Sequence, residues 1–257
     1  MTDPSAGPLL SVAGLTVSHG GHRIVDSLSL DVNPGELVGL IGANGAGKTT
    51  VFDAICGFVD HGGSVRFDGA EIGGWPPHRR ARAGIGRTWQ DVELFDDLTV
   101  EQNCRVAARP GGLRQTATDL FGLHRHHGDD EAVATALAAV GLADEANVRP
   151  SALSLGHRKL AGVARALAGA PKLLLLDEPA AGLDQSESLE FGRALRRLIV
   201  GGDGSLSGLL IDHDTQLIFD VCDRVYVLDF GVLVAEGTVD EIRRDPRVIA
   251  AYLGVGP

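Results

Sequence analysis

Residues 42–49 read GANGAGKT and follow a nearly continuous apolar run at residues 37–41. They fit the pattern G-x-x-x-x-G-K-[ST], in which glycines let successive backbone N–H groups point at phosphate oxygens. The apolar run suits a buried parallel strand, and we expect a helix to begin at residues 47–49, whose N-terminus adds a partial positive charge. Lys48 is expected to reach the β- and γ-phosphates of a nucleotide, and the hydroxyl of Thr49 to ligate Mg²⁺. The expected nucleotide contacts of this segment are Gly42, Asn44, Gly45, Ala46, Gly47, Lys48, Thr49 and Thr50.

A second pattern, four leucines followed by Asp177 and Glu178, narrows the choice among kinases, GTPases and ATPases. The leucines predict a core strand that places Asp177 at its carboxyl end, where ligands bind in open α/β sheets. Asp177 can then hold Mg²⁺ through water, and Glu178 can polarise an attacking water as general base. A hydrolase needs such a base, whereas a kinase must avoid activating water. The alternative is that the two carboxylates only cap the next helix.

Composition and charge fit one globular α/β chain. The 257 residues are enough for a sizeable core, and the 44% hydrophobic content argues against disorder. The formal net charge of −11 argues against broad binding to nucleic acid or anionic lipid. No apolar run is long enough to cross a bilayer, and residues 1–10 do not resemble a signal peptide. We expect Cys56, Cys104 and Cys222 to be reduced packing residues.

Hydrophobic periodicity predicts strands that alternate with helices, which indicates a mostly parallel sheet covered on both faces. Residues 100–167 are expected to be mostly helical, with a polar loop or irregular connection at 109–130. A helix is expected at about 186–200, and a hairpin around the turn at 229–231. The other expected strands are at residues 10–17, 28–32, 37–41, 64–67, 173–176 and 208–211.

Five further segments follow the order seen in ABC-transporter ATPases, which the chain resembles over nearly its full length. Gln90, which ends GRTWQ, resembles the glutamine of that family's Q-loop. The segment LSLGH at 153–157 is similar to the family signature LSGGQ, and AGLD at 181–184 is similar to its D-loop. His213 follows an apolar strand and resembles the switch histidine, and His19 occupies the place of the aromatic residue that stacks on adenine.

This resemblance implies roles and partners. Gln90 would contact Mg²⁺ and the attacking water and sense a membrane partner, and His213 would contact the γ-phosphate. Two such domains would pair head to tail, with ATP between Lys48 of one copy and the signature of the other. The signature residues that would contact nucleotide in this way are Ser154, Gly156 and His157. The chain would work with transmembrane permease subunits on the cytoplasmic side of the cell membrane.

The resemblance also implies the fold. It predicts a P-loop NTPase core with a mostly parallel sheet, an N-terminal antiparallel β subdomain and a helical signature subdomain. Residues 1–257 would form a single nucleotide-binding domain, with the helical part at about 91–165.

Three positions depart from the family pattern. Leu155 replaces the first glycine of the signature, a substitution that some branches of the family tolerate. His157 replaces glutamine, which predicts weaker or pH-sensitive contacts to nucleotide across the dimer. His19 replaces tyrosine or phenylalanine, and imidazole stacks with less area, so we expect modest adenine affinity. None of these changes removes a catalytic group.

Within the family, the segments RTWQ at 87–90 and EPAAGL at 178–183 are similar to branched-chain amino acid importer ATPases. The C-terminal segment at 235–254 is similar to the same group, although lipopolysaccharide-exporter ATPases share parts of it. The region between Gln90 and Ser154 is shorter than expected for the closest members. An exporter of a lipid-like substrate, a soluble non-transport ABC ATPase and a regulatory nucleotide binder are the alternatives, and the single phosphate loop and intact catalytic groups disfavour the last two.

Two other clusters have simpler interpretations. His124, His126 and His127 fit no standard zinc spacing, so we expect a solvated loop. Arg79, Arg80 and Arg82 form a short basic cluster, for which we expect a solvated face, with permease docking as the alternative.

Overall fold

The computed structural model describes residues 7–90, 94–108, 127–202 and 204–250. The chain divides into two compact units, residues 1–90 with 172–257, and residues 91–171. The first unit holds two sheets, whereas the described part of the second is helical. Every helix in the described ranges is too short or too polar to span a bilayer.

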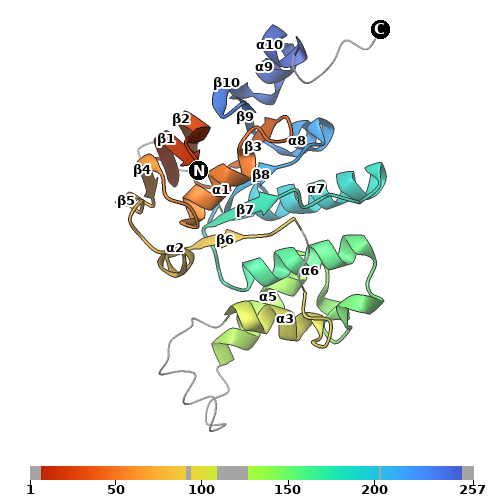
Figure 1. The fold of residues 1–257 in the computed structure, drawn as a ribbon. Coiled ribbons are helices and arrows are strands. Elements are labelled where there is room, and N and C mark those ends of the chain that lie inside the picture. Colours follow the sequence, from red (N-terminus) through yellow and green to blue (C-terminus); the bar gives the residue numbers. More distant parts are fainter. Residues whose placement is uncertain (1–6, 91–93, 109–126, 203, 251–257) are drawn as a thin grey trace. The chain divides into compact units, whose positions relative to one another are not determined.

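The larger sheet of the first unit has the strand order β10-β9-β3-β8-β7-β6 (Figure 1). Neighbouring strands within this sheet run parallel, except that β10 runs antiparallel to β9. This sheet confirms the expected α/β class. Its strands are β3 (Leu37–Gly42), β6 (Ile85–Arg87), β7 (Leu173–Asp177), β8 (Ser207–Ile211), β9 (Arg224–Asp229) and β10 (Val232–Thr238).

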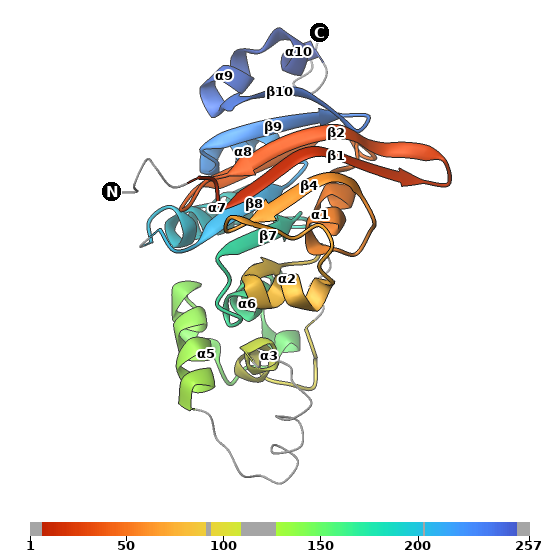
Figure 2. The same cartoon turned by 90° about the vertical axis from the view of Figure 1, so that its left-hand side faces the viewer.

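The smaller sheet is antiparallel, in the order β2-β1-β4-β5, and Figure 2 shows β1 between β2 and β4. It confirms the antiparallel N-terminal sheet expected from the sequence. Its strands are β1 (Leu10–His19), β2 (His22–Val32), β4 (Gly62–Phe67) and β5 (Ala70–Glu71). The helices of the first unit are α1 (Lys48–Cys56), α2 (Pro77–Ala83), α7 (Gln185–Ile199), α8 (Thr215–Val221), α9 (Val239–Arg244) and α10 (Pro246–Val248).

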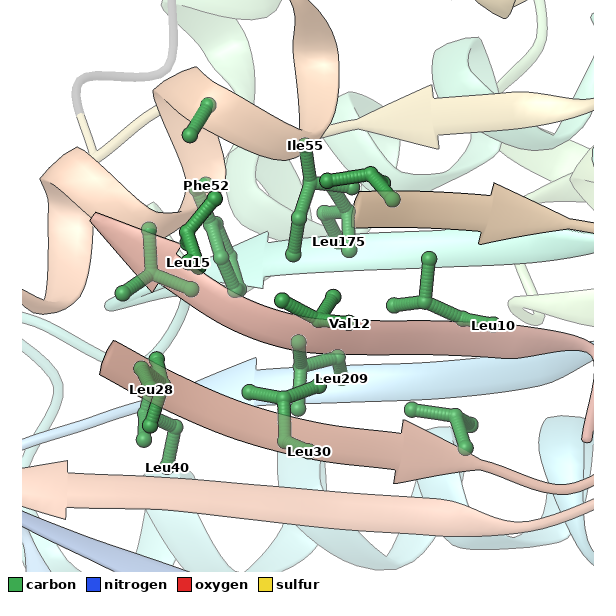
Figure 3. Packing of buried hydrophobic residues seen from close by; sticks show 14 of the residues in the cluster. Leu10, Val12, Leu15, Leu28, Leu30, Leu40, Phe52, Ile55, Leu175 and Leu209 are labelled. Carbon is green, nitrogen blue, oxygen red and sulfur yellow. The ribbon is translucent and has the colours of Figure 1, made fainter. Parts of the chain in front are cut away.

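Apolar side chains of both sheets and of α1 form one core (Figure 3). Leu10 and Val12 come from β1, Phe52 and Ile55 from α1, and Leu175 from β7, and all are at most 2% exposed. Burying a side chain of this size contributes about 1.5–3 kcal/mol relative to leaving it exposed. This packing fixes α1, and therefore the loop that precedes it, against the parallel sheet.

The other face of the parallel sheet packs closely against α7 and α8. A Cβ on Gly39 of β3 would lie 2.7 Å from Cγ2 of Ile218 on α8. A Cβ on Gly208 of β8 would lie 2.7 Å from Cδ1 of Ile199 on α7. Glycine at both positions lets the helices approach the strands that carry the site residues.

The second unit contains α3 (Val100–Ala108), α5 (His127–Ala139), the 3₁₀ turns η1 (Ala143–Glu145) and η2 (Pro150–Ala152), and α6 (Leu155–Leu167). The expected helical character of this region is confirmed for its described residues. His124 and His126 lie outside the described residues, and His127 is the first residue of α5. The assignment of the whole chain as one nucleotide-binding domain stays a prediction.

The interpretation of the arginine cluster as a solvated face is wrong for Arg80. Its side chain lies on α2, and the residue is 2% exposed. The guanidinium donates to the carbonyl oxygens of Ala54 and Ile55 at 2.6 and 2.9 Å, in the last turn of α1. A cation at the negative end of a helix is favourable, and the Ala54 oxygen accepts from Arg80 in addition to the N–H of the C-cap residue Gly57 at 3.2 Å. Arg80 therefore closes the C-terminal end of α1. Arg79 and Arg82 are exposed, as expected.

Arg224 on β9 joins two carboxylates in a partly buried network. Its guanidinium donates to Asp31 of β2 at 2.8 Å and to Glu36, the residue before β3, and Tyr226 donates to Asp31 at 3.2 Å. The hydrogen bond to Glu36, opposed by burial, raises the pKa of Arg224 above its ordinary value. This network links the smaller sheet to the larger one.

We expect Arg224→Gln to lower the free energy of unfolding by about 2–3 kcal/mol, because it leaves two carboxylates without their cation. Urea denaturation followed by circular dichroism measures the change. The control is Arg247→Gln, which removes a 68% exposed arginine side chain from its pair with Asp245 and should cost less than about 1 kcal/mol. Equal losses for both variants would show that the network contributes no more than a surface pair.

Candidate nucleotide-binding site

The phosphate loop connects β3 to α1, as the sequence predicts. Gly45 and Gly47 have φ of 80° and 99°, which glycine adopts without strain. A Cβ on Gly47 would lie 2.8 Å from the carbonyl oxygen of Ile24, so the loop also needs glycine for close approach. Gly47 is the N-cap of α1, which begins at Lys48. The free N–H groups of this helix end and the loop form a concave donor surface suited to phosphate.

Lys48 curls back over this loop. Its ammonium donates to the carbonyl oxygens of Gly42 and Ala43 at 2.8 and 3.0 Å, and the residue is 6% exposed. Burial lowers the pKa of Lys48, while the carboxylates of Glu178 and Asp177 oppose that shift. The backbone carbonyls thus fix the ammonium at the loop, and the carboxylates at the end of β7 balance its charge.

The hairpin between β9 and β10 supports the loop from outside. The N–H of Gly231 donates to the carbonyl oxygen of Ala46 at 3.0 Å, and the oxygen of Gly231 accepts from the N–H of Asp26 at 2.8 Å. Gly231 has φ of 81°, and a Cβ there would lie 2.3 Å from the carbonyl oxygen of Ile24. The hairpin therefore ties the phosphate loop to β2.

We expect Gly231→Ala to lower the free energy of unfolding by about 1–3 kcal/mol and to weaken ATP binding, because the added methyl must displace the backbone that supports the loop. Isothermal titration calorimetry measures the affinity. Gly69→Ala is the matched control, since Gly69 has a similar φ of 76° but open space around its Cβ position. If both variants bind ATP as the parent does, the hairpin is not a support of the loop.

Asp177 is the last residue of β7, in register with Ile211 on β8, and Glu178 follows directly after the strand. Asp177 is 4% exposed, and burial raises its pKa, while the hydrogen bond from Arg87 opposes the rise. Glu178 has φ of 44°, a left-handed conformation that costs a non-glycine residue about 1 kcal/mol or more. Its N–H donates to the carbonyl oxygen of Ile211 at 2.8 Å, which holds this turn.

Gln90, Glu178 and His213 come together from three separate segments. The Gln90 amide donates to Oε2 of Glu178 at 2.9 Å, and Nδ1 of His213 lies 3.8 Å from the same oxygen. These are three side chains that can position a water molecule and accept its proton. The alternative that the carboxylate pair only caps a helix does not fit, since Asp184 is the N-cap of α7.

A cavity of about 550 Å³ joins the phosphate loop to these three side chains. It is lined by Ile24, Asn44, Gly45, Gly47, Lys48, Thr49, Thr50, Gln90, Glu178 and His213. Nine of these ten were expected from the sequence; Ile24 was not, because a β2 residue far from the motifs carries no signal of its own. Gly42, Ala46 and Asp177 support the cavity without lining it.

His19 lies at the end of β1 and lines a neighbouring cavity of about 470 Å³. Ile24 and Thr50 line both cavities. His19 therefore lies in a cavity next to the phosphate site, within which the adenine of a bound ATP could lie. The stacking of His19 on adenine stays a prediction.

The signature segment belongs to the second unit, at the start of α6. Ser154 is the N-cap, and its hydroxyl accepts from the N–H of His157 at 3.2 Å. Nδ1 of His157 lies 2.8 Å from Oε1 of Glu145, and Leu155 is 44% exposed. Gly156 lies within this first turn. The roles of these residues toward nucleotide on another copy stay predictions.

The oxygen donors of the site suit a hard cation. Thr49 offers a hydroxyl, Gln90 an amide and Asp177 a carboxylate, which is the ligand type that Mg²⁺ prefers. No group of three or more His, Cys, Asp or Glu side chains in the described ranges could hold a metal, so a cation here would rely on the hydroxyl and amide oxygens as well as on Asp177. The three cysteines are free and buried, as expected.

Comparison with known families decides the assignment. The family model "ABC transporter" matches residues 25–181. The chain belongs to the ABC transporter family. It is an ATP-binding subunit of this family and an ATPase. A second model, "Branched-chain amino acid ATP-binding cassette transporter", matches residues 232–257.

Relatives within the ABC transporter family cover almost the whole chain. It is 40% identical to the high-affinity branched-chain amino acid transport ATP-binding protein LivG of Escherichia coli K12, over 96% of this chain and 98% of the relative. It is 37% identical to the lipopolysaccharide export system ATP-binding protein LptB of the same strain, over 95% of this chain and 97% of the relative. A nucleotide-free ATP-binding cassette from an ABC transporter has a similar structure, with a TM-score of 0.82 and 26% sequence identity. The match covers 96% of this chain and 100% of that structure's chain.

Proposed function

We propose that this ATPase powers the uptake of branched-chain or other hydrophobic amino acids across the cell membrane. The observation that carries the proposal is the match of residues 232–257 to the branched-chain amino acid family model. The 40% identity to LivG over almost the full length supports it, and the 37% identity to LptB makes export of a lipid-like substrate the alternative.

The residues around the cavity support a division of roles in hydrolysis. Lys48 and the N–H groups of the loop would bind the β- and γ-phosphates. Glu178 would accept a proton from the attacking water, and Gln90 and His213 would orient that water and the γ-phosphate. Mg²⁺, held by Thr49, Gln90 and Asp177, would supply charge neutralisation at the β- and γ-phosphates.

Transport also needs partners. We propose that the chain lies on the cytoplasmic face of the membrane with transmembrane permease subunits and a second ATPase, either another copy or a related chain. ATP would bind between Lys48 of one copy and Ser154, Gly156 and His157 of the other. Hydrolysis would then shift the population from paired to separated ATPases, because the γ-phosphate contacts are lost.

The test is uptake of radiolabelled leucine by cells of the source organism that lack the gene. We expect uptake to fall and to return with the wild-type gene but not with Glu178→Gln. Affinity purification of the tagged chain from native membranes should recover two multi-spanning permeases. Unchanged amino acid uptake, together with co-purification of a lipid exporter, would overturn the substrate assignment and favour the alternative.

A further inference from the structure

Arg87 is a buried cation that lies behind the phosphate site. It is the last residue of β6, in register with Leu175 of β7, and its side chain is 6% exposed. It is not among the residues that line the described phosphate cavity. It therefore has no direct route to nucleotide in this structure, and its effect must pass through the residues that it contacts.

Two carboxylates from different elements share this guanidinium, and we call the arrangement the Arg87 bridge. Nη1 bonds Oδ1 of Asp53 on α1 at 2.6 Å, and Nη2 bonds Oδ2 of Asp177 on β7 at 2.9 Å. The helix that follows the phosphate loop and the strand that carries the acidic pair are thus joined by one side chain. Hydrogen bonds between charged partners are stronger and more directional than neutral ones.

We propose that Arg87 is a positioning residue that fixes the Asp177 carboxylate for Mg²⁺ in the nucleotide site. The bond to Oδ2 holds the position and plane of this carboxylate, while Asp53 holds the guanidinium. Groups that orient metal ligands in this way set metal affinity, and their loss costs about 10–100-fold in metal affinity or activity. The inference rests on the proposed Mg²⁺ and nucleotide site, but not on the transported substrate.

The same arginine connects Asp177 to the segment that carries Gln90. The guanidinium carbon lies 4.1 Å from the ring centroid of Trp89, which leaves the indole stacked on the cation. Gln90 comes next and donates to Glu178. A shift of Asp177 would therefore move the Gln90 segment as well, so the metal-binding carboxylate and the water-orienting amide are positioned together.

Arginine suits this bridge better than lysine does. Its planar fork can donate from two nitrogens in fixed directions and stack on an indole at the same time, whereas an ammonium is a point charge on a flexible stem. Lysine at this position would still neutralise Asp53 and Asp177 but would not fix their orientation. Arg87→Lys therefore separates charge from geometry.

The experiment measures binding rather than turnover. A fluorescent, non-hydrolysable ATP analogue is titrated onto the full chain in excess Mg²⁺ and again in EDTA, and the ratio of the two Kd values gives the gain due to Mg²⁺. We expect Arg87→Gln to lower this gain by about 10-fold or more and to raise the half-saturating Mg²⁺ concentration, while the Kd in EDTA stays within about 3-fold. Arg87→Lys should lie between Arg87→Gln and the parent.

Asp53→Asn provides a second variant that leaves Arg87 and Asp177 paired and the fold intact. It should lower the Mg²⁺ gain by a few-fold, and this loss should vanish in the Arg87→Gln background, because Asp53 reaches Asp177 through Arg87. Asp53 also lines the cavity beside His19, and a direct effect there would change the Kd in Mg²⁺ and in EDTA alike and leave their ratio unchanged. Arg224→Gln is the matched control: it removes another arginine that joins two carboxylates and should lower stability without changing the Mg²⁺ gain.

The outcomes separate the two proposals. If the parent chain binds nucleotide but gains no affinity from Mg²⁺, the proposed Mg²⁺ site is wrong, and if it binds no nucleotide at all, the proposed nucleotide site is wrong. The parent chain, Arg87→Lys and Asp53→Asn could all gain the same affinity for the ATP analogue from Mg²⁺. In that case the nucleotide site stands, and the positioning role of Arg87 is overturned. Should Arg87→Gln fail to fold, those two milder variants decide the question by themselves.

Discussion

Glu178→Gln is expected to reduce the rate of ATP hydrolysis by about 10²–10⁴-fold, the usual contribution of a general base. Glutamine keeps the size of the side chain and its contact with Gln90, but it cannot accept a proton from water. ATP affinity should stay within a few-fold of the parent, because the phosphate loop and Lys48 are unchanged. Steady-state phosphate release and equilibrium ATP binding measure the two effects separately.

Two copies of the same variant should also form a dimer in saturating ATP, because bound ATP persists when hydrolysis stops. Size-exclusion chromatography with ATP should show a dimer, and a monomer there would count against the head-to-tail arrangement. Glu236→Gln, on an exposed residue of β10, is the control and should hydrolyse ATP at the parental rate. A hydrolysis rate near the parental value for Glu178→Gln would assign the general base to another residue.

Lys48→Ala should weaken ATP binding by at least about 100-fold, which corresponds to about 2.8 kcal/mol. The ammonium is the one cation that lines the described phosphate cavity. Its loss removes charge-assisted contacts to phosphate and the two bonds that hold the loop carbonyls of Gly42 and Ala43. Calorimetric titration with ATP measures the affinity, and a thermal melt without nucleotide reports whether the loop change unfolds the chain.

Lys172→Ala is the matched control for Lys48. The Lys172 side chain is 53% exposed and pairs with Asp68 on the surface, so its removal should leave ATP binding unchanged. An undiminished affinity for Lys48→Ala, or an equal loss in the control, would mean that the phosphate loop was misinterpreted.

The sequence predicted those parts of the site that short contiguous patterns encode. The phosphate loop and the acidic pair at 177–178 each follow directly after an apolar run. Because a buried strand ends where its apolar run ends, both motifs are placed at strand ends. His213 and Gln90 needed the family resemblance, since a single polar residue after a strand is ambiguous. The structure then places both side chains near Glu178, which no spacing rule could have established.

Other features could not be predicted because their partners are remote in sequence. Arg87 reaches Asp53 and Asp177, and its place in the RTWQ segment indicates family likeness but neither of these partners. Arg80 was misinterpreted for the same reason, since the helix end that it closes precedes it by more than twenty residues. The elements β6, α2, α8, α9 and α10 were not expected, because they are short and have little periodicity.

The strand order has a consequence for how the protein is made on the ribosome. β3, which leads into the phosphate loop, lies between β9 and β8, with Leu37 beside Gly208 and Gly42 beside Leu228. Both neighbours are synthesised long after β3, so an emerging chain exposes this apolar strand with neither edge paired. A truncated product that stops before β8 would keep GANGAGKT intact and still lack the ladder that shapes it. Premature termination should therefore yield a species prone to aggregation instead of a smaller nucleotide binder.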